Sequence, residues 1–458
     1  MADGVQDPKL QSIYEARNSE PIWIEEDGSL TRDAVEVASL LAGAGDQGLP
    51  PDLYSLPTHP GVDASAADKA QFDIAFSRAT FKYARDMGYG LLNPASVFDD
   101  VNLPRRRGDV EDGFVAALRS SHASEYLRTL EPGGDYPRLK VALKAYEKMA
   151  GQQWPQIIGA ISRKDYPEAL TQRLESEGYL KAPADRTAAT VALKAFQTAN
   201  SLEANGQLDR KTLAALNTQP QERVDQIKAN MERWRWLPRQ IASRFIVVNV
   251  PTANLALIDG GVPVIESKVV VGAPDKQTPI FVTDAVAITI NPSWHIPKSI
   301  VEKEIKPKIE KDQAYLNAKG ISQKNGEYVQ NPGPANALGL VKFEMPNNYD
   351  VYLHDTPSKQ AFLSDDRALS HGCVRVEAIR PLAANVLGIG EDELANKIAE
   401  NQTRRQPIAQ PIPVYILYWT VLPKADGTLM FAKDIYGRDA RVASAMKQIS
   451  GTRLSLRK

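Results

Sequence analysis

Apolar residues in the first part of the chain recur at helical spacing. Val35, Val37, Leu40 and Leu41 alternate with charged and small residues, which is the pattern of an amphipathic helix. Turn signals such as Gly48–Pro51 (GLPP) interrupt these stretches. The pattern predicts a mainly helical N-terminal domain over residues 1–160, and no group of residues in it has catalytic spacing.

A compact helical unit follows over residues 161–218. Its three predicted helices carry apolar residues at Leu170 and Leu174, at Val191, Ala195 and Phe196, and at Leu213 and Leu216. Asp209 follows an Asn-Gly turn and is placed to cap the third helix. Residues 219–243 are predicted to be a helical linker that returns to the N-terminal domain.

From Arg244 the pattern changes to strands. Seven runs are β-branched or apolar: Phe245–Val250, Leu255–Ile258, Val262–Val271, Val286–Ile290, Leu338–Phe343, Val351–His354 and Val414–Trp419. Asp259-Gly260-Gly261 joins two of them as a hairpin. Short strands with turn signals predict an antiparallel, β-sandwich-like domain over residues 244–440, with a tail over 441–458. The fold class is therefore α+β with several domains.

A long charged insertion, residues 291–334, interrupts the strands. Ser299 and Glu302 have capping-box spacing for a helix that Pro307 should break or kink. Long insertions beside a β core are often functional. We therefore expect a lid over a site, with a rigid surface decoration as the alternative.

Composition narrows the function classes. Of 458 residues, 43% are hydrophobic and 24% are charged, with a formal net charge of −1. This balance gives no reason to expect nucleic acid or an anionic membrane as partner. No apolar run reaches the ~18 residues of a transmembrane segment. The first residues lack the layout of an export signal, so either the protein is cytosolic or a signal has been removed.

The single cysteine has chemically suggestive neighbours. Ser370–Val376 reads SHGCVRV, and in an extended strand His371, Cys373 and Arg375 would share one face. Positive neighbours should lower the pKa of the Cys373 thiol. Gly372 leaves room for a substrate, and the amides of Gly372 and Cys373 are candidate oxyanion donors.

A cysteine nucleophile needs a base, and His354 is the better candidate. It ends the predicted strand Val351–His354 and can approach the thiol from a separate strand. His371 lies two residues from Cys373 on the same strand, which places its ring sideways of the thiol. A lone cysteine next to a valine is often a core residue, but chance rarely produces this combination of His, Gly, Cys and Arg with a second His upstream.

These residues resemble a known family. The SHGCVR segment resembles the signature of the L,D-transpeptidase (YkuD) catalytic domain. Four more segments resemble its large YcbB-type subclass: Asn291–Pro297 (NPSWHIP), Pro332–Gly339 (PGPANALG), Val351–Pro357 (VYLHDTP) and Asp434–Asp439 (DIYGRD). Residues 161–218 resemble the peptidoglycan-binding type 1 domain, through Gly178–Leu180, Phe196-Gln197, Gly206 and Thr212–Asn217.

The resemblance implies roles for the site residues. Cys373 would be the nucleophile and His354 the proton acceptor and donor, with His371 and Gly372 completing the catalytic set. The implied substrate-binding residues are Arg375, Tyr352, Trp294, Ser370 and Asn336. No metal and no cofactor are implied.

The implied reaction joins peptidoglycan stem peptides by a 3→3 cross-link in the periplasm, the export signal having been removed. Carbapenems are the expected inhibitors. Water as acceptor would make the protein an L,D-carboxypeptidase, and a protein amine would make it an enzyme that anchors outer-membrane proteins. A wall-binding protein without catalysis is the alternative of another class.

Overall fold

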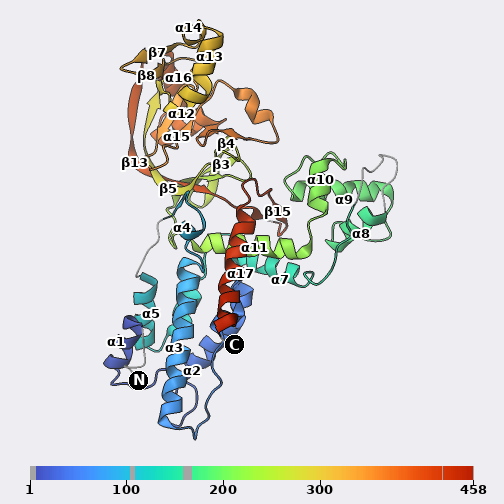
Figure 1. Cartoon of the computed structure of the whole chain (residues 1–458), viewed down its shortest axis with the longest axis vertical. Helices are drawn as coiled ribbons and strands as arrows, with labels where there is room; N and C mark the ends of the chain where they lie inside the picture. The colour runs from blue at the N-terminus through green and yellow to red at the C-terminus, as the bar shows by residue number, and fades with distance from the viewer. Residues whose placement is uncertain (1–6, 104–108, 158–167, 425, 457–458) are drawn as a thin grey trace. The chain divides into compact units, whose positions relative to one another are not determined.

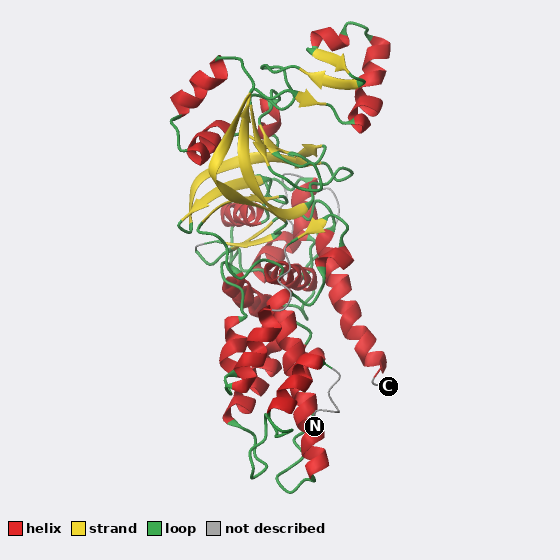
Figure 2. Cartoon of the chain, turned by 90° about the vertical axis from the view of Figure 1, so that its left-hand side faces the viewer, coloured by secondary structure: helices red, strands yellow, loops and turns green. Residues whose placement is uncertain are grey.

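The computed structural model describes residues 7–103, 109–157, 168–424 and 426–456. The chain forms two compact units. One comprises Met1–Asp99, Leu103–Gln240 and Thr420–Lys458, and the other comprises Asp100–Asn102 and Ile241–Trp419. Figure 1 follows the elements along the chain, and Figure 2 separates helices from strands. The predicted boundary at residues 160 and 161 lies outside the described residues.

The first unit is mainly helical, as predicted for the N-terminal region (Figure 2). Its helices are α1 (Pro8–Ala16), α2 (Arg32–Ala42), α3 (Ala66–Tyr89), α4 (Pro94–Val97), α5 (Asp109–Arg119), α6 (Ala123–Thr129), α7 (Tyr136–Glu147), α8 (Glu168–Ser176), α9 (Arg186–Ala199), α10 (Arg210–Leu216), α11 (Pro220–Arg235) and α17 (Arg438–Leu456). A short hairpin, β14 (Val421–Pro423) and β15 (Leu429–Phe431), belongs to the same unit.

Helices α8, α9 and α10 have a hydrophobic core of their own, as the sequence predicts. Asp209 caps α10 by accepting a hydrogen bond of 2.7 Å from the Thr212 amide. The predicted face of α9 is wrong in part, because Val191 is 65% exposed and Ala195 is exposed as well. The buried face of α9 passes through Leu193 and Phe196 instead.

The second unit is built on a curled sheet (Figure 2). Its strands are β1 (Val101–Asn102), β2 (Arg244–Asn249), β3 (Asn254–Asp259), β4 (Val262–Gly272), β5 (Ile280–Ile290), β9 (Val341–Glu344), β10 (Leu353–His354), β11 (Ala368–Ser370), β12 (Val374–Val376) and β13 (Arg404–Leu417). Among the described residues, eight strands pair in the order β5–β13–β2–β3–β4–β12–β10–β9. Because β9 also pairs with β5, these pairings form a closed circuit.

The strand directions differ in part from the predicted antiparallel sheet. Most pairs are antiparallel, but β1–β5, β2–β13, β4–β11 and β10–β12 are parallel. A sequence pattern shows which residues alternate across a strand, whereas strand direction depends on how the chain returns to the sheet. The long chain between β2 and β13 allows them to run the same way.

The insertion has its own fold. It contains α12 (Lys298–Ile300), the π-helical segment η4 (Val301–Ile305), α13 (Lys306–Lys311), α14 (Tyr315–Ala318) and a three-stranded sheet of β6 (Trp294–His295), β8 (Glu327–Gln330) and β7 (Ile321–Lys324). Ile296, Val301, Ile305 and Ile321 form its buried core. This cluster makes the insertion a small folded element rather than a loose loop.

Two predictions for the insertion need correction. Pro297 is the N-cap of α12 and no side chain caps this helix, so Ser299 and Glu302 do not form a capping box. Pro307 does not end the helix, because it lies at the start of α13 directly after the π-helical segment. Proline has no amide hydrogen to donate within a helix. The π-turn before it already interrupts the regular hydrogen-bond pattern, so the helix can continue through Pro307.

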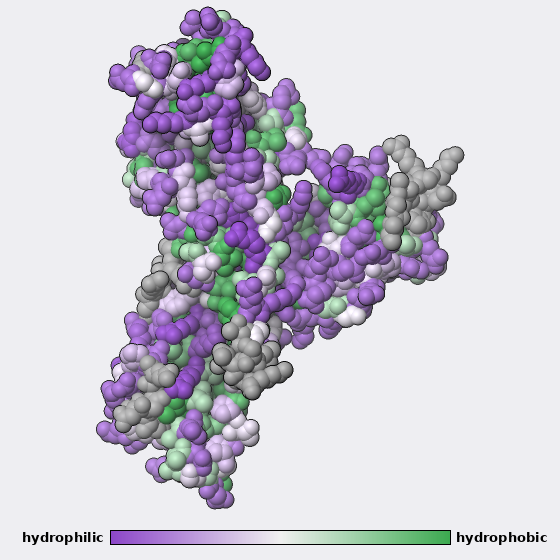
Figure 3. Space-filling view, viewed as in Figure 1, coloured by the Kyte–Doolittle hydropathy of each residue, from purple (hydrophilic) through white to green (hydrophobic). Residues whose placement is uncertain are grey.

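Helices α15 (Ile379–Leu387) and α16 (Glu391–Ala399) follow β12 in the second unit. On the face shown in Figure 3, the surface is mainly hydrophilic, with scattered apolar residues. None of the helices in the described part of the chain is long and apolar enough to span a bilayer.

Candidate active site

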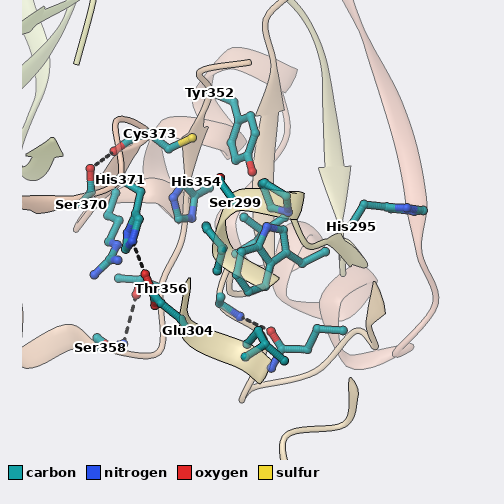
Figure 4. A pocket seen from close by; sticks show the side chains of 18 of the residues that line it. His295, Ser299, Glu304, Tyr352, His354, Thr356, Ser358, Ser370, His371 and Cys373 are labelled. Atoms are coloured by element: carbon teal, nitrogen blue, oxygen red, sulfur yellow. Dashed lines mark hydrogen bonds and ion pairs between the residues drawn. The ribbon is translucent and has the colours of Figure 1, made fainter. Parts of the chain in front are cut away.

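A pocket of about 1020 Å³ lies in the second unit, between the sheet and the insertion. Seven of the predicted site residues line it: Trp294, Tyr352, His354, Ser370, His371, Cys373 and Arg375. Figure 4 shows Cys373, His354 and Tyr352 gathered on one side of this pocket, with Glu304 and Ser299 of the insertion nearby. The structure therefore brings together most of the site that the sequence predicts.

His354 lies between two cations on neighbouring strands. Strand β10 pairs with β9 so that His354 is opposite Lys342, and with β12 so that His354 is opposite Arg375. Residues directly opposite on paired strands have side chains on the same face of the sheet. Lys342, His354 and Arg375 therefore form a row, and all three line the pocket.

The imidazole of His354 is neutral and oriented. Its Nδ1 lies 2.5 Å from the backbone carbonyl oxygen of Asp355. Because a carbonyl only accepts, Nδ1 must carry the hydrogen, and Nε2 is left as a proton acceptor. Burial lowers the pKa of His354 to about 4, and the charges of Arg375 and Lys342 act in the same direction. His354 is thus a neutral base at physiological pH.

Cys373 lies in the bend that precedes β12 and is half-buried. Its Sγ is 3.6 Å from the backbone oxygen of Asp350. Burial raises the pKa of the thiol, although Tyr352, Lys342 and Arg375 act to lower it. The expected lowered pKa is therefore wrong for the free protein, because desolvation of the thiolate outweighs its positive neighbours.

Two hydroxyl groups hold the backbone around the thiol. Ser370 Oγ donates to the carbonyl of Cys373 (2.6 Å) and accepts from the amide of Gly372 (3.1 Å). Thr278 Oγ1 donates to the carbonyl of Gly372 and accepts from the amide of Gly272, both at 2.8 Å. Ser370 therefore orients the nucleophile rather than offering its hydroxyl to a ligand.

Gly372 is required for its backbone conformation. Its φ of +114° lies in a region that residues with a Cβ rarely adopt. The segment is consequently bent, and only Val374–Val376 forms a strand. The predicted oxyanion role of the Gly372 amide is corrected, because Ser370 already accepts its hydrogen bond. For the Cys373 amide, no acceptor lies within reach among the described residues.

His371 contacts the insertion. Its Nε2 pairs with Glu304 Oε1, on the π-helical segment η4, and Lys276 Nζ is 3.7 Å from the same carboxylate oxygen. Figure 4 shows the His371–Glu304 pair on the pocket wall. This pair connects the cysteine segment with the insertion, so the geometry gives His371 a bridging position.

Two aromatic residues border the pocket. The ring of Tyr352 packs edge-on against the ring of His354, with a centroid distance of 5.5 Å. Burial raises the pKa of the Tyr352 hydroxyl, and the neighbouring thiol adds to this effect. Trp294 lies on β6 and packs against the core of the insertion. These rings supply apolar surface to the lining of the pocket.

Asn336 lies outside the pocket, which corrects its expected role in substrate binding. It is 1% exposed. Its Nδ2 donates to the carbonyls of Pro292, Gln330 and Asn331, and its Oδ1 accepts from the amide of Leu338. All of its hydrogen-bonding groups are used, so Asn336 fastens the base of the insertion.

Three residues at the site were missed by sequence reasoning. Lys342, Thr278 and Glu304 belong to no chemical motif, and their contributions depend on strand register and on the fold of the insertion. Lys342 had one weak signal, since it is a charged residue within the apolar run Leu338–Phe343.

Three parts of the chain match known domain families. Residues 243–416 match the L,D-transpeptidase catalytic domain (YkuD), residues 8–143 match a scaffold domain, and residues 164–216 match a "Putative peptidoglycan binding domain". A "Putative L,D-transpeptidase" of Haemophilus influenzae is 29% identical over 270 residues, which cover 53% of this chain and 55% of that protein. The chain thus matches about half the length of this curated relative.

Solved structures with some likeness also include L,D-transpeptidases. An L,D-transpeptidase from Mycobacterium smegmatis is 13% identical, with 38% of this chain and 59% of that chain covered and a TM-score of 0.22. For Mycobacterium tuberculosis L,D-transpeptidase 1 the identity is 12%, the coverage is 38% and 61%, and the TM-score is 0.19.

Proposed function

The chain contains an L,D-transpeptidase catalytic domain, a scaffold domain and a peptidoglycan-binding domain, and from this premise we propose that the protein cross-links peptidoglycan stem peptides. The donor is a tetrapeptide stem that ends in D-Ala. The acyl acceptor is an amine of a neighbouring stem, and the product is a 3→3 cross-link.

The observation that carries the proposal is the placement of one thiol and one neutral imidazole in the same pocket. His354 has its Nε2 free to accept a proton, and Cys373 is a neutral thiol whose pKa is raised. These states favour general-base catalysis, in which the proton leaves the thiol as the sulfur attacks. A preformed thiolate and imidazolium pair is not needed.

The reaction then has two halves. Cys373 Sγ attacks the carbonyl at the L-centre of diaminopimelate, and its proton passes to His354 Nε2. The Cys373 amide donates to the developing oxyanion. The C–N bond breaks and the proton goes to the departing D-Ala. An acceptor amine attacks the thioester, gives its proton to His354, and the thiol of Cys373 is restored.

The remaining residues bind and position the substrate in this proposal. Arg375, Tyr352 and Trp294 line the donor site, Ser370 and Gly372 shape the cysteine segment, and His371 couples this segment to the insertion. The insertion, residues 291–334, serves as a lid that favours an amine over water as acceptor.

The domain plan supports a protein of the cell wall. We retain residues 1–160 as scaffold, 161–218 as the wall-binding module, 219–243 as linker, 244–440 as catalytic domain and 441–458 as tail. The matches to domains that act on peptidoglycan support a location in the periplasm or at the cell wall. We also propose that the sheet has a two-layered, sandwich-like arrangement. Carbapenems are proposed to acylate Cys373.

Product analysis tests this function. Purified muropeptides are incubated with the protein and with Cys373→Ala, and the products are analysed by mass spectrometry. We expect D-Ala release and 3→3 dimers from the parent alone. Tripeptides without dimers would indicate an L,D-carboxypeptidase. Coupling to an added outer-membrane protein would indicate an anchoring enzyme, and binding without any product would indicate a wall-binding protein.

A further inference from the structure

Two cations lie beside the catalytic pair. Lys342 and Arg375 lie on either side of His354 and line the pocket. Among the described residues, neither forms an ion pair with a carboxylate. Glu304, a carboxylate of the insertion that lines the pocket, is already bound by His371 and Lys276. Glu344 and the pocket-lining Asp350 act on Lys342 without forming an ion pair with it, so the ammonium is left available to a carboxylate of the substrate.

Lys342 is the more informative of the two, because its ammonium is held in one place. Its Nζ lies 4.0 Å from the centroid of the Tyr352 ring, and the side chain is half-buried. Burial lowers the pKa of Lys342, whereas the nearby Cys373 acts to raise it. A partly desolvated ammonium gains most from a carboxylate that arrives with the substrate.

The donor stem has a carboxylate at the matching place. In a tetrapeptide stem, the group that leaves is D-Ala, whose carboxylate is two bonds from the nitrogen of the broken amide. A cation that binds this carboxylate must lie beside the attacking sulfur. Lys342 lies opposite His354 on the paired strand and lines the same pocket as Cys373, which meets this requirement.

We propose that Lys342 binds the C-terminal carboxylate of the donor stem and thereby selects stems with a free terminal carboxyl group. This inference rests on the proposed function and adds a specificity-determining residue to it. The lysines of the insertion that line the pocket, Lys303, Lys308 and Lys319, are exposed. Solvent screens their charge, so they discriminate less between a carboxylate and an amide.

The test compares two donors that differ in one group. One is the tetrapeptide stem with a free C-terminal carboxylate, and the other is the same stem ending in a carboxamide. For the parent we expect kcat/KM of acylation to favour the free acid on the order of 10- to 100-fold, the worth of one charge-assisted hydrogen bond. Lys342→Met should remove this preference, so that both donors react at similar rates.

Two further variants separate selection from folding. Lys342→Arg keeps the charge and should keep the preference, even if the absolute rate falls. Lys311→Met removes an exposed charge of α13 outside the pocket and should keep the preference of the parent. A Lys342→Met protein that loses the same factor with both donors would overturn the inference, since this pattern indicates only a structural or general electrostatic role.

The outcome for the parent separates this inference from the function on which it rests. If the parent is acylated equally by both donors, the role of Lys342 is contradicted and the proposed function stands. If neither donor acylates Cys373, the proposed function fails, and the role of Lys342 fails with it.

Discussion

The chemistry of single residues here depends on burial more than on neighbouring charge. Cys373 has two cations nearby, yet the pKa of its thiol is raised because the thiolate would be poorly solvated. His354 has the same two cations nearby, and there burial and charge act together to lower the pKa to about 4. Both partners are consequently neutral over a wide pH range.

This pairing predicts an unusual pH profile for acylation. Below about pH 4 His354 is protonated and cannot accept the proton of Cys373. As pH rises through about 4, the imidazole becomes neutral and the rate should rise. The rate should then stay nearly constant towards pH 8, because the raised pKa keeps Cys373 a thiol. Stopped-flow measurement of acylation over this range checks the profile.

The matched variants for this prediction are His354→Ala and His371→Ala. Loss of the base should lower the acylation rate by ~10²–10⁴, whereas loss of His371 should cost less because this residue is paired with Glu304. A rate in the parent that rises only near pH 6–7, or a larger effect of His371→Ala, contradicts the assignment of His354.

For single residues, the sequence indicates which chemical groups are present, but not their protonation, hydrogen bonds or burial. The segment Ser370–Val376 and His354 were recognisable because few residue types perform nucleophilic catalysis. The direction of the pKa shift of Cys373, the hydrogen bond from the Gly372 amide to Ser370 and the buried position of Asn336 depend on contacts between distant segments. A linear pattern does not contain those contacts.

At the scale of elements, a contact between two side chains connects the insertion with the cysteine segment. Glu304 lies on the π-helical segment η4 and pairs with His371. A π-turn shifts the side chains that follow it around the helix axis, which changes the residues that face the pocket. Glu304 and Lys303 line the pocket, whereas Glu302 of the same segment does not.

Glu304→Gln should weaken the closure of the insertion over the site. The neutral amide keeps the size of the side chain but loses the carboxylate charge that His371 and Lys276 contact. We expect fewer cross-links and a higher ratio of hydrolysed to cross-linked product, since water reaches the thioester more easily. Quantified muropeptide products measure this ratio.

Glu302→Gln is the matched control, because Glu302 pairs with the exposed Lys306 outside the pocket. It should leave the product ratio unchanged. An equal effect of both variants, or no effect of Glu304→Gln, would indicate that the insertion is a rigid decoration.

The elements themselves were predictable to different degrees. Apolar, β-branched runs located β2, β3 and β4 closely, because a half-buried strand must alternate. Strand β13 begins ten residues earlier than expected, at Arg404 rather than Val414. Proline is unfavourable inside a strand, and the strand has a register shift between Pro407 and Ile412. The hairpin β7–β8 was missed within a charged segment.

At the scale of the whole molecule, the catalytic domain and the wall-binding module have separate cores and separate tasks in the proposed function. The module of α8–α10 is closed at its base by Asn217, whose amide group exchanges two hydrogen bonds with the backbone of Ile157. These two residues are therefore suitable ends for removal of the module.

Replacement of the chain between Ile157 and Asn217 by a short Gly/Ser linker should weaken binding to isolated peptidoglycan in a pelleting assay. Acylation of Cys373 by a soluble donor should remain close to the parent rate, because the catalytic pocket lies in the other unit. Unchanged pelleting would contradict the wall-binding role of the module, and the soluble-donor rate serves as the folding control.

The division into a helical scaffold, a three-helix module and a β-rich domain was predictable, because the period of the apolar pattern changes near Arg244. That the C-terminal part of the chain returns to the first unit was not predictable. Residues from Thr420 onward belong to that unit. Asp439 pairs with Arg233 of α11 and accepts from the Thr420 hydroxyl. Such long-range pairing has no local signal.

In the proposed reaction, Cys373 is acylated by the donor stem with His354 as its base. Intact-mass spectrometry of an acid-quenched reaction tests this acylation most directly. The account predicts that the parent gains one acyl group, mapped to Cys373, with release of D-Ala. Cys373→Ala should gain none, and His354→Ala should gain it much more slowly. An acyl group on Cys373→Ala, or one mapped to another residue of the parent, would contradict the account.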